Sequence, residues 1–230
     1  LPDEAADALA RLQRLPAVGA IRWMTHLASA DEPDNPLTSV QTERFGTMVD
    51  GTSEASLPNS AATLRGLEPY SDWIRPGIML YGASPFEDTS VHPPLQPVMT
   101  LEAALISVKR LPADHGVGYG GRFACPEAMP VGVVSIGYGD GYPRHAPDGT
   151  PVVVAGQHCP LIGRVSMDMV MVDLRNAPQA RVGDRAILWG TNPRATAVAT
   201  ACGTISYELF CRLTPRVERV YRRGATHGEG

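Results

Sequence analysis

Apolar residues in the first third of the chain follow two patterns in turn. In residues 2–15, apolar side chains recur at helical spacing, at Ala5, Leu9 and Leu12. Residues 18–27 instead form a compact apolar run. The first pattern predicts an amphipathic helix, and the second predicts a buried strand.

The same alternation continues towards residue 82. Thr38 is placed to cap a helix that runs to about residue 49 and ends at Gly51. Asn59 is placed to cap a second helix that runs to residue 67, and residues 73–75 predict a short strand. Helices that alternate with strands predict a parallel sheet with crossover connections.

The pattern changes at a proline-rich stretch, residues 83–97, which we interpret as an extended connector. Beyond it, short β-branched runs are separated by glycine and proline turns. They predict an antiparallel β-domain at residues 98–230, closed or nearly so. Its expected strands are residues 105–111, 131–136, 151–155, 161–171, 185–189 and 216–221, and its expected helices are residues 195–202 and 206–213.

The first domain, residues 1–82, is short for a complete α/β fold. A complete β/α barrel takes roughly 250 residues, and fewer than half that number precede the connector. We therefore expect an α/β plus all-β protein, in which the C-terminal half of a TIM-like β/α barrel is followed by an antiparallel β-domain.

Composition narrows the choice of partners. The net charge of -4 gives no electrostatic support for binding nucleic acid. The apolar runs are far shorter than the roughly 20 residues that cross a bilayer, so no membrane span is expected. The four cysteines form no C-x-x-C pair, which argues against a bound metal and indicates reduced thiols of a cytoplasmic protein. A small molecule or another protein chain is the expected partner.

Local features of the first domain together describe half of a phosphate-cofactor site. His26 lies at the end of the predicted buried strand, and Ser60 opens a helix, where a hydroxyl and free N–H groups meet an anion. Arg75 and Gly77 lie at a turn. Taken singly, these residues have ordinary interpretations as a structural histidine, a helix cap and a surface arginine. Their combination favours a planar cofactor that carries a phosphate.

Eight segments, taken in order, carry a resemblance to a known family. They read THLASADE, PNSAATLR, WIRPGIMLYG, GVGYGGRF, SIGYGDGYPR, LIGRVSMDMVMVD, GDRAILWG and ISYELFCRL. In order and approximate spacing they resemble the alanine racemases over nearly the whole chain. The resemblance implies a pyridoxal 5'-phosphate enzyme with an N-terminal β/α barrel and a C-terminal β-domain. It also implies a head-to-tail homodimer with shared active sites that act on alanine.

The resemblance assigns roles to individual residues. Tyr119, in GVGYG, matches a catalytic tyrosine that reaches the partner's barrel. The ordinary pKa of a tyrosine is near 10, so positive charge or hydrogen-bond donors must lower it in a base. The residues that match cofactor contacts are His26 beside the ring, Arg75 at the ring nitrogen, Ser60, Gly77 and Ile78 at the phosphate, and Tyr207 near the phosphate end. The residues that match the substrate side are Tyr138, Met167 and Asp168.

The sequence departs from the family at the cofactor lysine. Family members hold the cofactor through a lysine in an A-V-x-K-A-x-A-Y-G-H-G motif, which does not occur in the sequence. Lys109 is the only lysine, and it lies in ISVKRLPA of the predicted β-domain. The early-barrel arginine segment that orients the substrate carboxylate is absent too. We therefore expect this chain to be the carboxyl-terminal part of a longer enzyme and to be inactive alone.

Three functional hypotheses follow. In the first, a cytoplasmic bacterial enzyme interconverts L- and D-alanine for peptidoglycan synthesis, with a lysine and Tyr119 as its two bases. In the second, the chain is an inactive dimerising or binding module. In the third, it belongs to an amino-acid racemase of broader specificity. Both a biosynthetic and a catabolic role stay open.

Overall fold

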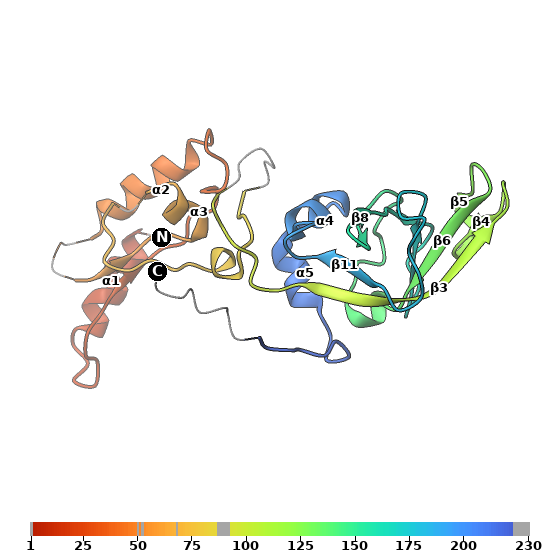
Figure 1. The fold of residues 1–230 in the computed structure, drawn as a ribbon. Coiled ribbons are helices and arrows are strands. Elements are labelled where there is room, and N and C mark those ends of the chain that lie inside the picture. Colours follow the sequence, from red (N-terminus) through yellow and green to blue (C-terminus); the bar gives the residue numbers. More distant parts are fainter. Residues whose placement is uncertain (1, 50, 52, 68, 87–92, 223–230) are drawn as a thin grey trace, which may run out of the picture. The chain divides into compact units, whose positions relative to one another are not determined.

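The chain divides into two compact units, which we call the α/β unit, Leu1–Met99, and the β unit, Thr100–Gly230 (Figure 1). The computed structural model describes residues 2–49, 51, 53–67, 69–86 and 93–222. The predicted connector includes residues 87–92, which lie outside the described residues, so its role stays a prediction. Within the described ranges, no helix combines the length and the apolar character that a bilayer crossing needs.

A pair of parallel strands organises the α/β unit. Strands β1 (Trp23–Met24) and β2 (Ala55–Ser56) pair in register, with Trp23 opposite Ala55. Helix α2 (Leu37–Gly46) lies between them in the sequence, which confirms the predicted crossover connection. The unit also contains α1 (Pro2–Leu12), α3 (Ser60–Leu64) and the 3-10 turn η1 (Ile78–Tyr81). Its core is formed by Leu27, Ala30, Phe45, Ala55, Leu57, Ala61, Ala62 and Phe86.

One predicted helix cap is confirmed and another is wrong. Asn59 caps α3, because its side-chain oxygen accepts a hydrogen bond from Ala62 N at 3.0 Å. Thr38 instead lies buried inside α2, which starts after Pro36 and ends at Gly46, well before Gly51. Proline has a fixed φ that suits the start of a helix, and it takes the place that the sequence pattern gave to Thr38.

Two predicted strands are shorter in the structure. The strand expected at residues 18–27 is confined to β1, and residues 73–75 contribute only an isolated parallel bridge from Trp73 to Ser56. A strand needs a neighbouring strand for its backbone hydrogen bonds. Among the described residues, the pairing with β2 extends over only two residues of β1. An apolar run alone therefore overestimated the strand length.

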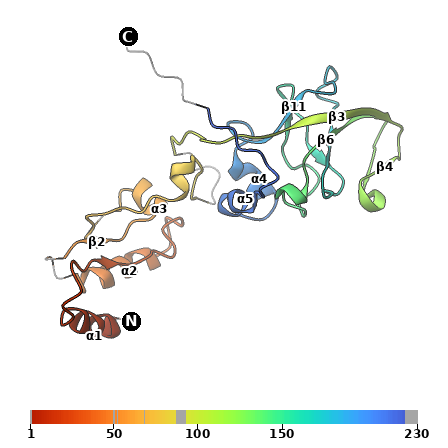
Figure 2. The ribbon, with the colours of Figure 1, turned by 90° about the horizontal axis from the view of Figure 1, so that it is seen from below.

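The β unit is built on a seven-stranded sheet whose neighbouring strands are all antiparallel, in the order β8-β7-β11-β3-β6-β10-β9. Its strands β11, β3 and β6 are labelled in Figure 2. The long β3 pairs along β6, with Lys109 opposite Val131. The antiparallel fold is therefore as predicted. The strands are β3 (Leu101–Leu111), β6 (Met129–Val134), β7 (Val153–Val154), β8 (Gln157–His158), β9 (Leu161–Ile162), β10 (Val170–Asp173) and β11 (Arg185–Trp189).

Smaller elements complete the β unit. Strands β4 (Gly116–Val117) and β5 (Phe123–Ala124) form a separate hairpin around the 3-10 turn η2 (Tyr119–Gly121), and this hairpin lies at the far end of β3 in both views (Figures 1 and 2). Helices α4 (Ala195–Ala201) and α5 (Ser206–Arg212) confirm the two helices that the sequence predicted, and they pack side by side. A third 3-10 turn, η3 (Tyr138–Asp140), follows β6.

The segment predicted as one strand at residues 161–171 is two strands. Strands β9 and β10 pair antiparallel with each other, with Met171 opposite Ile162. Gly163, at a φ of 73°, begins the turn between them, and this turn carries Met167 and Asp168. The strand predicted at residues 216–221 does not form either. Val217 N instead bonds back to Thr214 O at 3.1 Å, in a turn.

Aromatic and aliphatic side chains fill the core of the β unit. The rings of Tyr142 and Trp189 stack with centroids 6.1 Å apart, and both side chains are fully buried. Burial raises the pKa of the Tyr142 hydroxyl and also raises the pKa of the Cys202 thiol to about 11. Both groups are therefore held in their neutral forms, which the apolar surroundings favour.

Alkaline pH is expected to destabilise the β unit through Cys202. The folded protein keeps a thiol proton that the unfolded chain loses near pH 9.0, the ordinary pKa of the group. The contribution of Cys202 is complete below that pH and is lost as the pH rises towards about 11. The urea-unfolding free energy should fall over this interval, and less steeply in Cys202→Ala. The exposed Cys211 offers a matched control, and identical slopes for Cys202→Ala and Cys211→Ala would contradict the prediction.

Candidate functional site

Arg75 forms hydrogen bonds at the carboxyl ends of both parallel strands. Its Nη2 donates to Thr25 O at 2.6 Å and to Leu57 O at 3.3 Å, and its Nη1 donates to Ser56 Oγ at 2.6 Å. Its Nε donates to no residue that the structure describes, and so it stays available as a donor. Ligands of parallel sheets lie at the carboxyl ends of the strands, and Arg75 therefore presents a cationic donor where a cofactor is expected.

Ser60 lies beside the turn at Gly77. The serine is buried, and its Oγ accepts hydrogen bonds from Gly77 N at 2.8 Å and from Met79 N at 3.4 Å. A Cβ built on Gly77 would meet only Ser60 Oγ, at an ordinary contact distance of 3.8 Å. The protein itself therefore leaves space above Gly77. Apart from those of Gly77 and its two chain neighbours, no described backbone atom comes within 4 Å of that Cβ position.

The remaining predicted residues of the α/β unit lie around this cluster. His26 is exposed and directly follows Thr25, whose backbone N bonds to Ser56 O at 3.2 Å. Asn59 Nδ2 donates to Leu27 O at 3.3 Å, which ties the His26 segment to the start of α3. Ile78, by contrast, is buried in η1. The candidate residues of the α/β unit, which are spread in the sequence from His26 to Ile78, thus lie near the same end of the parallel strands.

Tyr119 stands at the tip of the β4–β5 hairpin. Its side chain is 70% exposed, and its hydroxyl bonds to no described residue. The hairpin is held by close backbone contact: a Cβ on Gly118 would lie 2.8 Å from Arg164 N, and one on Gly163 would lie 2.7 Å from Val117 O. Both glycines have positive φ, a conformation that residues with a Cβ rarely adopt. Glycine at these two positions therefore allows the hairpin to pack closely against the segment at residues 163–164.

Tyr138, Met167 and Asp168, predicted on the substrate side, are brought together by two adjoining turns. Tyr138 N donates to Ser166 O at 3.0 Å, and Gly139 N donates to Met167 O at 2.9 Å. Tyr138 packs partly against the core, whereas Met167 and Asp168 are exposed. Backbone hydrogen bonds therefore join the two turns to each other.

Three charged residues that sequence reasoning missed adjoin these turns. The Arg144 guanidinium lies 5.9 Å from the centroid of the Tyr138 ring. Arg216 pairs with both Asp140 and Asp168. The hydrogen bond to Asp168 and the charge of Asp140 raise the pKa of Arg216. The SIGYGDGYPR segment already contained Asp140 and Arg144, but nothing local linked Arg216 to it.

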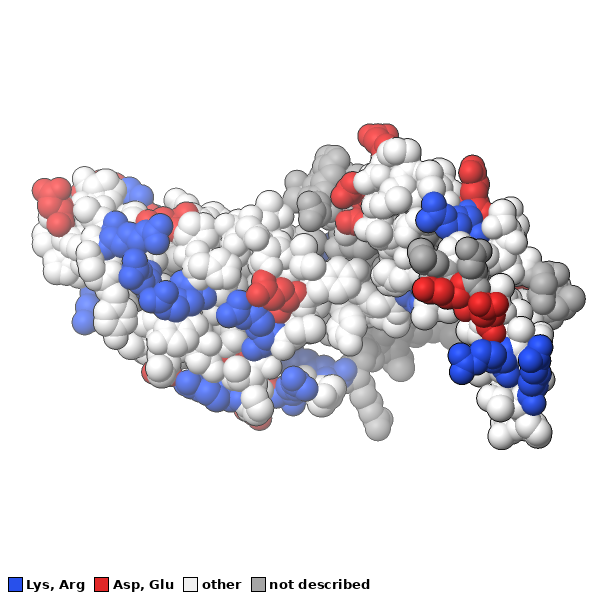
Figure 3. All heavy atoms as spheres, turned by 180° about the vertical axis from the view of Figure 1, so that it is seen from behind, with Lys and Arg blue, Asp and Glu red and all other residues white. Residues whose placement is uncertain are grey.

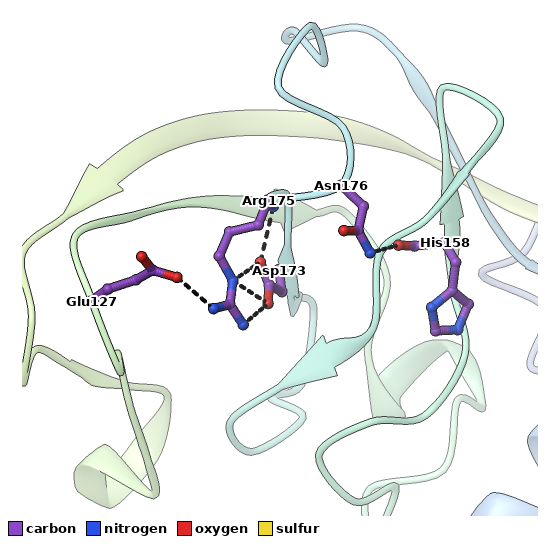
Figure 4. A network of polar contacts seen from close by, with 5 residues as sticks. All are labelled: Glu127, His158, Asp173, Arg175 and Asn176. Atoms are coloured by element: carbon purple, nitrogen blue, oxygen red, sulfur yellow. Dashed lines mark hydrogen bonds and ion pairs between the residues drawn. The ribbon is translucent and has the colours of Figure 1, made fainter.

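A second polar network joins the segment between β5 and β6 to strand β10 (Figure 4). Arg175 Nη2 contacts Asp173 at 2.7 Å and its Nη1 contacts Glu127 at 2.8 Å. These two hydrogen-bonded partners, Asp173 foremost, raise the pKa of Arg175. Nearby, Asn176 Nδ2 donates to His158 O at 3.0 Å. Asp173 belongs to β10 and Glu127 lies between β5 and β6, so the network ties the base of the Tyr119 hairpin to the sheet.

Two further residues lie in the β unit. Tyr207 is the second residue of α5 and is partly exposed, so it belongs to a different unit from the other predicted cofactor contacts. Lys109 is exposed on β3.

Figure 3 shows basic side chains interspersed with acidic ones over the face it draws. Within the described part of the chain, no group of three or more His, Cys, Asp or Glu residues is placed to hold a metal ion.

Comparison with known families gives two matches. The family described as "Alanine racemase, N-terminal domain" matches residues 1–85. The family described as "Alanine racemase, C-terminal domain" matches residues 98–221, which is more than half of the chain. The two matches follow one another in the order that the units have in the sequence.

Individual proteins are similar over nearly the whole chain. An alanine racemase of Halorhodospira halophila is 56% identical over 95% of this chain and 61% of its own length. One of Pseudomonas fluorescens is 52% identical over 97% of this chain and 63% of its own length. The crystal structure of the biosynthetic alanine racemase from Pseudomonas aeruginosa superposes with a TM-score of 0.93 at 45% identity, covering 97% of this chain and 63% of that one. The chain therefore spans about three fifths of the length of the curated relatives it matches.

Proposed function

We propose that this chain, which belongs to the alanine racemase family, forms part of a pyridoxal-phosphate enzyme that interconverts L- and D-alanine. The two family matches and the relatives described above support this proposal. We further propose that the α/β unit is part of a TIM-like barrel and that the enzyme is a cytoplasmic homodimer with shared active sites, which supplies D-alanine for peptidoglycan. The related structure from Bartonella henselae, at 29% identity and a TM-score of 0.81, contains covalently bound pyridoxal phosphate.

The observation that carries the proposal is the cluster of Arg75, Ser60 and Gly77 at the carboxyl ends of β1 and β2. The buried Ser60 hydroxyl and the N–H group of Ile78 suit a phosphate, since such groups donate to anions. The N–H of Gly77 would join them by exchanging its bond to Ser60 Oγ for one to the phosphate. The space left above Gly77 is where a bound group fits without displacing protein atoms. His26 is exposed beside the strand ends, where it would flank the ring.

Arg75 would face the ring nitrogen through its free Nε. A guanidinium keeps its proton at all physiological pH values, so the nitrogen opposite would accept a hydrogen bond and stay unprotonated. When bound, pyridoxal phosphate supplies an electron sink that weakens the Cα–H bond of the amino acid. Arg75 would moderate that sink and favour return of the proton over side reactions.

Tyr119 would hold and move the proton at Cα on one face of the amino acid. Its exposed position at the hairpin tip suits a side chain that reaches the active site of another subunit. The resemblance implies a lysine for the opposite face. We do not assign Lys109 to it, because this residue lies on β3 among the sheet hydrogen bonds.

The activity is tested by measuring D-alanine formed from L-alanine, with added pyridoxal phosphate, by the protein in its natural full-length form. Serine, lysine and arginine serve as competing substrates in the same assay. Preference for alanine supports the proposal. Equal rates on all four amino acids would favour a racemase of broader specificity, and absence of any racemisation would favour a binding module.

Replacing Ser60 by alanine is expected to weaken the binding of pyridoxal phosphate about 10- to 100-fold, because a hydrogen bond to a charged group contributes roughly 1.5–3 kcal/mol. Cofactor absorbance during equilibrium dialysis measures this affinity. Ser84→Ala is the matched control, since the only bond of the Ser84 hydroxyl to a described residue is the one it accepts from Phe86 N in the same unit. An unchanged affinity in a folded Ser60→Ala protein would contradict the assignment.

A further inference from the structure

Arg216 bridges two aspartates that belong to different turns of the β unit. Its Nη2 lies 2.6 Å from Asp168 Oδ1, and its Nε lies 3.2 Å from Asp140 Oδ1. Asp140 is the more buried of the two carboxylates, with 13% of its side chain exposed against 55% for Asp168. The planar guanidinium presents donors in a fixed fork, which allows one side chain to hold two acceptors in a set geometry.

Each aspartate is fixed to residues predicted on the substrate side. Asp140 ends η3, the turn that begins with Tyr138, and its Oδ2 accepts from Gly137 N at 2.9 Å. Asp168 directly follows Met167. Arg216 Nη1 lies close to Gly139, because a Cβ at that glycine would be only 2.4 Å away. The guanidinium therefore covers the boundary between the two turns, residues 137–140 and 166–168, which we call the seam.

The backbone around Arg216 is anchored to the same seam. Thr214 N donates to Asp140 O at 3.1 Å, and Thr214 Oγ1 donates to Gly139 O at 3.0 Å. Thr214 Oγ1 also accepts from Arg216 N at 3.4 Å. The backbone and the side chain of Thr214 thus each hold the segment that follows α5 to the η3 turn, and the side chain of Arg216 adds two ion pairs.

We infer that Arg216 is a positioning residue that holds Tyr138 and the Met167–Asp168 pair in a single arrangement. This inference rests on the proposed function, in which those side chains meet the amino-acid substrate. Arg216 acts through them and does not itself contact the reacting atoms. Loss of the bridge separates the two turns and weakens substrate binding, while proton transfer at Tyr119 proceeds once the substrate is bound.

Three variants test the inference. Arg216→Gln removes both ion pairs, and Arg216→Lys keeps the charge but lacks the fork that reaches both carboxylates. Arg212→Gln is the matched control, because Arg212 lies four residues away, carries the same charge and pairs with Glu208 instead. Urea unfolding of each full-length protein first establishes that the variants remain folded.

The first measurement is amide hydrogen exchange at residues 137–141 and 166–169, which requires no enzymatic activity. Exchange at Tyr138 and Gly139, whose N–H groups bridge the turns, should accelerate about tenfold in Arg216→Gln and less in Arg216→Lys. It should stay unchanged in Arg212→Gln. Unchanged exchange in Arg216→Gln, or equal acceleration in the control, overturns the inference.

The second measurement separates KM from kcat in the full-length enzyme. Arg216→Gln should raise KM for alanine about tenfold and change kcat less than about threefold, the signature of lost substrate binding. Arg216→Lys should recover part of that loss. Accelerated exchange with an unchanged KM overturns the positioning role. If the unmodified enzyme does not racemise alanine, the proposed function fails, and the positioning of the two turns is then decided by the exchange result alone.

Discussion

Replacing Tyr119 by phenylalanine is expected to lower kcat for alanine racemisation on the order of 10³-fold, within the range that a positioned acid or base contributes. The substitution removes only the hydroxyl. Because that hydroxyl bonds to no described residue and the side chain is 70% exposed, stability should change little. Initial rates in both directions and urea unfolding of the same samples measure the two effects.

The isotope pattern gives a sharper result than the rate alone. In deuterated water, Tyr119→Phe should retain Cα–H exchange with one enantiomer of alanine and lose it with the other, since the base on only one face is removed. Tyr221→Phe is the control, because Tyr221 is 89% exposed and outside the proposed site. Equal loss of exchange with both enantiomers would show that Tyr119 is not a base for one face.

Replacing Gly137 by alanine is expected to destabilise the β unit by about 3 kcal/mol, the upper part of the usual cost of overpacking. A Cβ at this position would lie 2.3 Å from Ser166 O and 2.4 Å from Met167 O. Both obstacles are backbone atoms, which have no rotamer through which to move away. The two turns must therefore separate, and KM for alanine should rise as Tyr138 and Met167 lose their alignment. Urea unfolding and steady-state kinetics measure these effects.

Gly19→Ala supplies the matched control for the same chemical change. Nothing lies within 4 Å of a Cβ built on Gly19, and its φ is not in the left-handed region. This variant should match the original protein within about 0.5 kcal/mol, as surface substitutions usually do. A Gly137→Ala protein as stable as Gly19→Ala would contradict the described contact between the turns.

Local patterns predicted best where the deciding interaction is itself local. The cap at Asn59 is made within three residues, and helices α4 and α5 follow from short periodic segments. Patterns failed where a distant partner decides. The apolar run from residue 161 predicts a single strand, whereas in the structure Gly163 breaks it and β9 folds back on β10. The run at residues 18–27 likewise forms a strand only over the residues that pair with β2.

The sequence by itself determined the family resemblance and the choice of candidate site residues, because the motifs around His26, Ser60, Arg75 and Tyr119 are contiguous and ordered. Only the tertiary structure decided how they are supported. Arg75 is held by the ends of two strands, and Arg216 meets Asp140 and Asp168 from far along the chain. Such contacts depend on which backbones approach each other, and hydrophobic spacing within one segment carries no information about that approach.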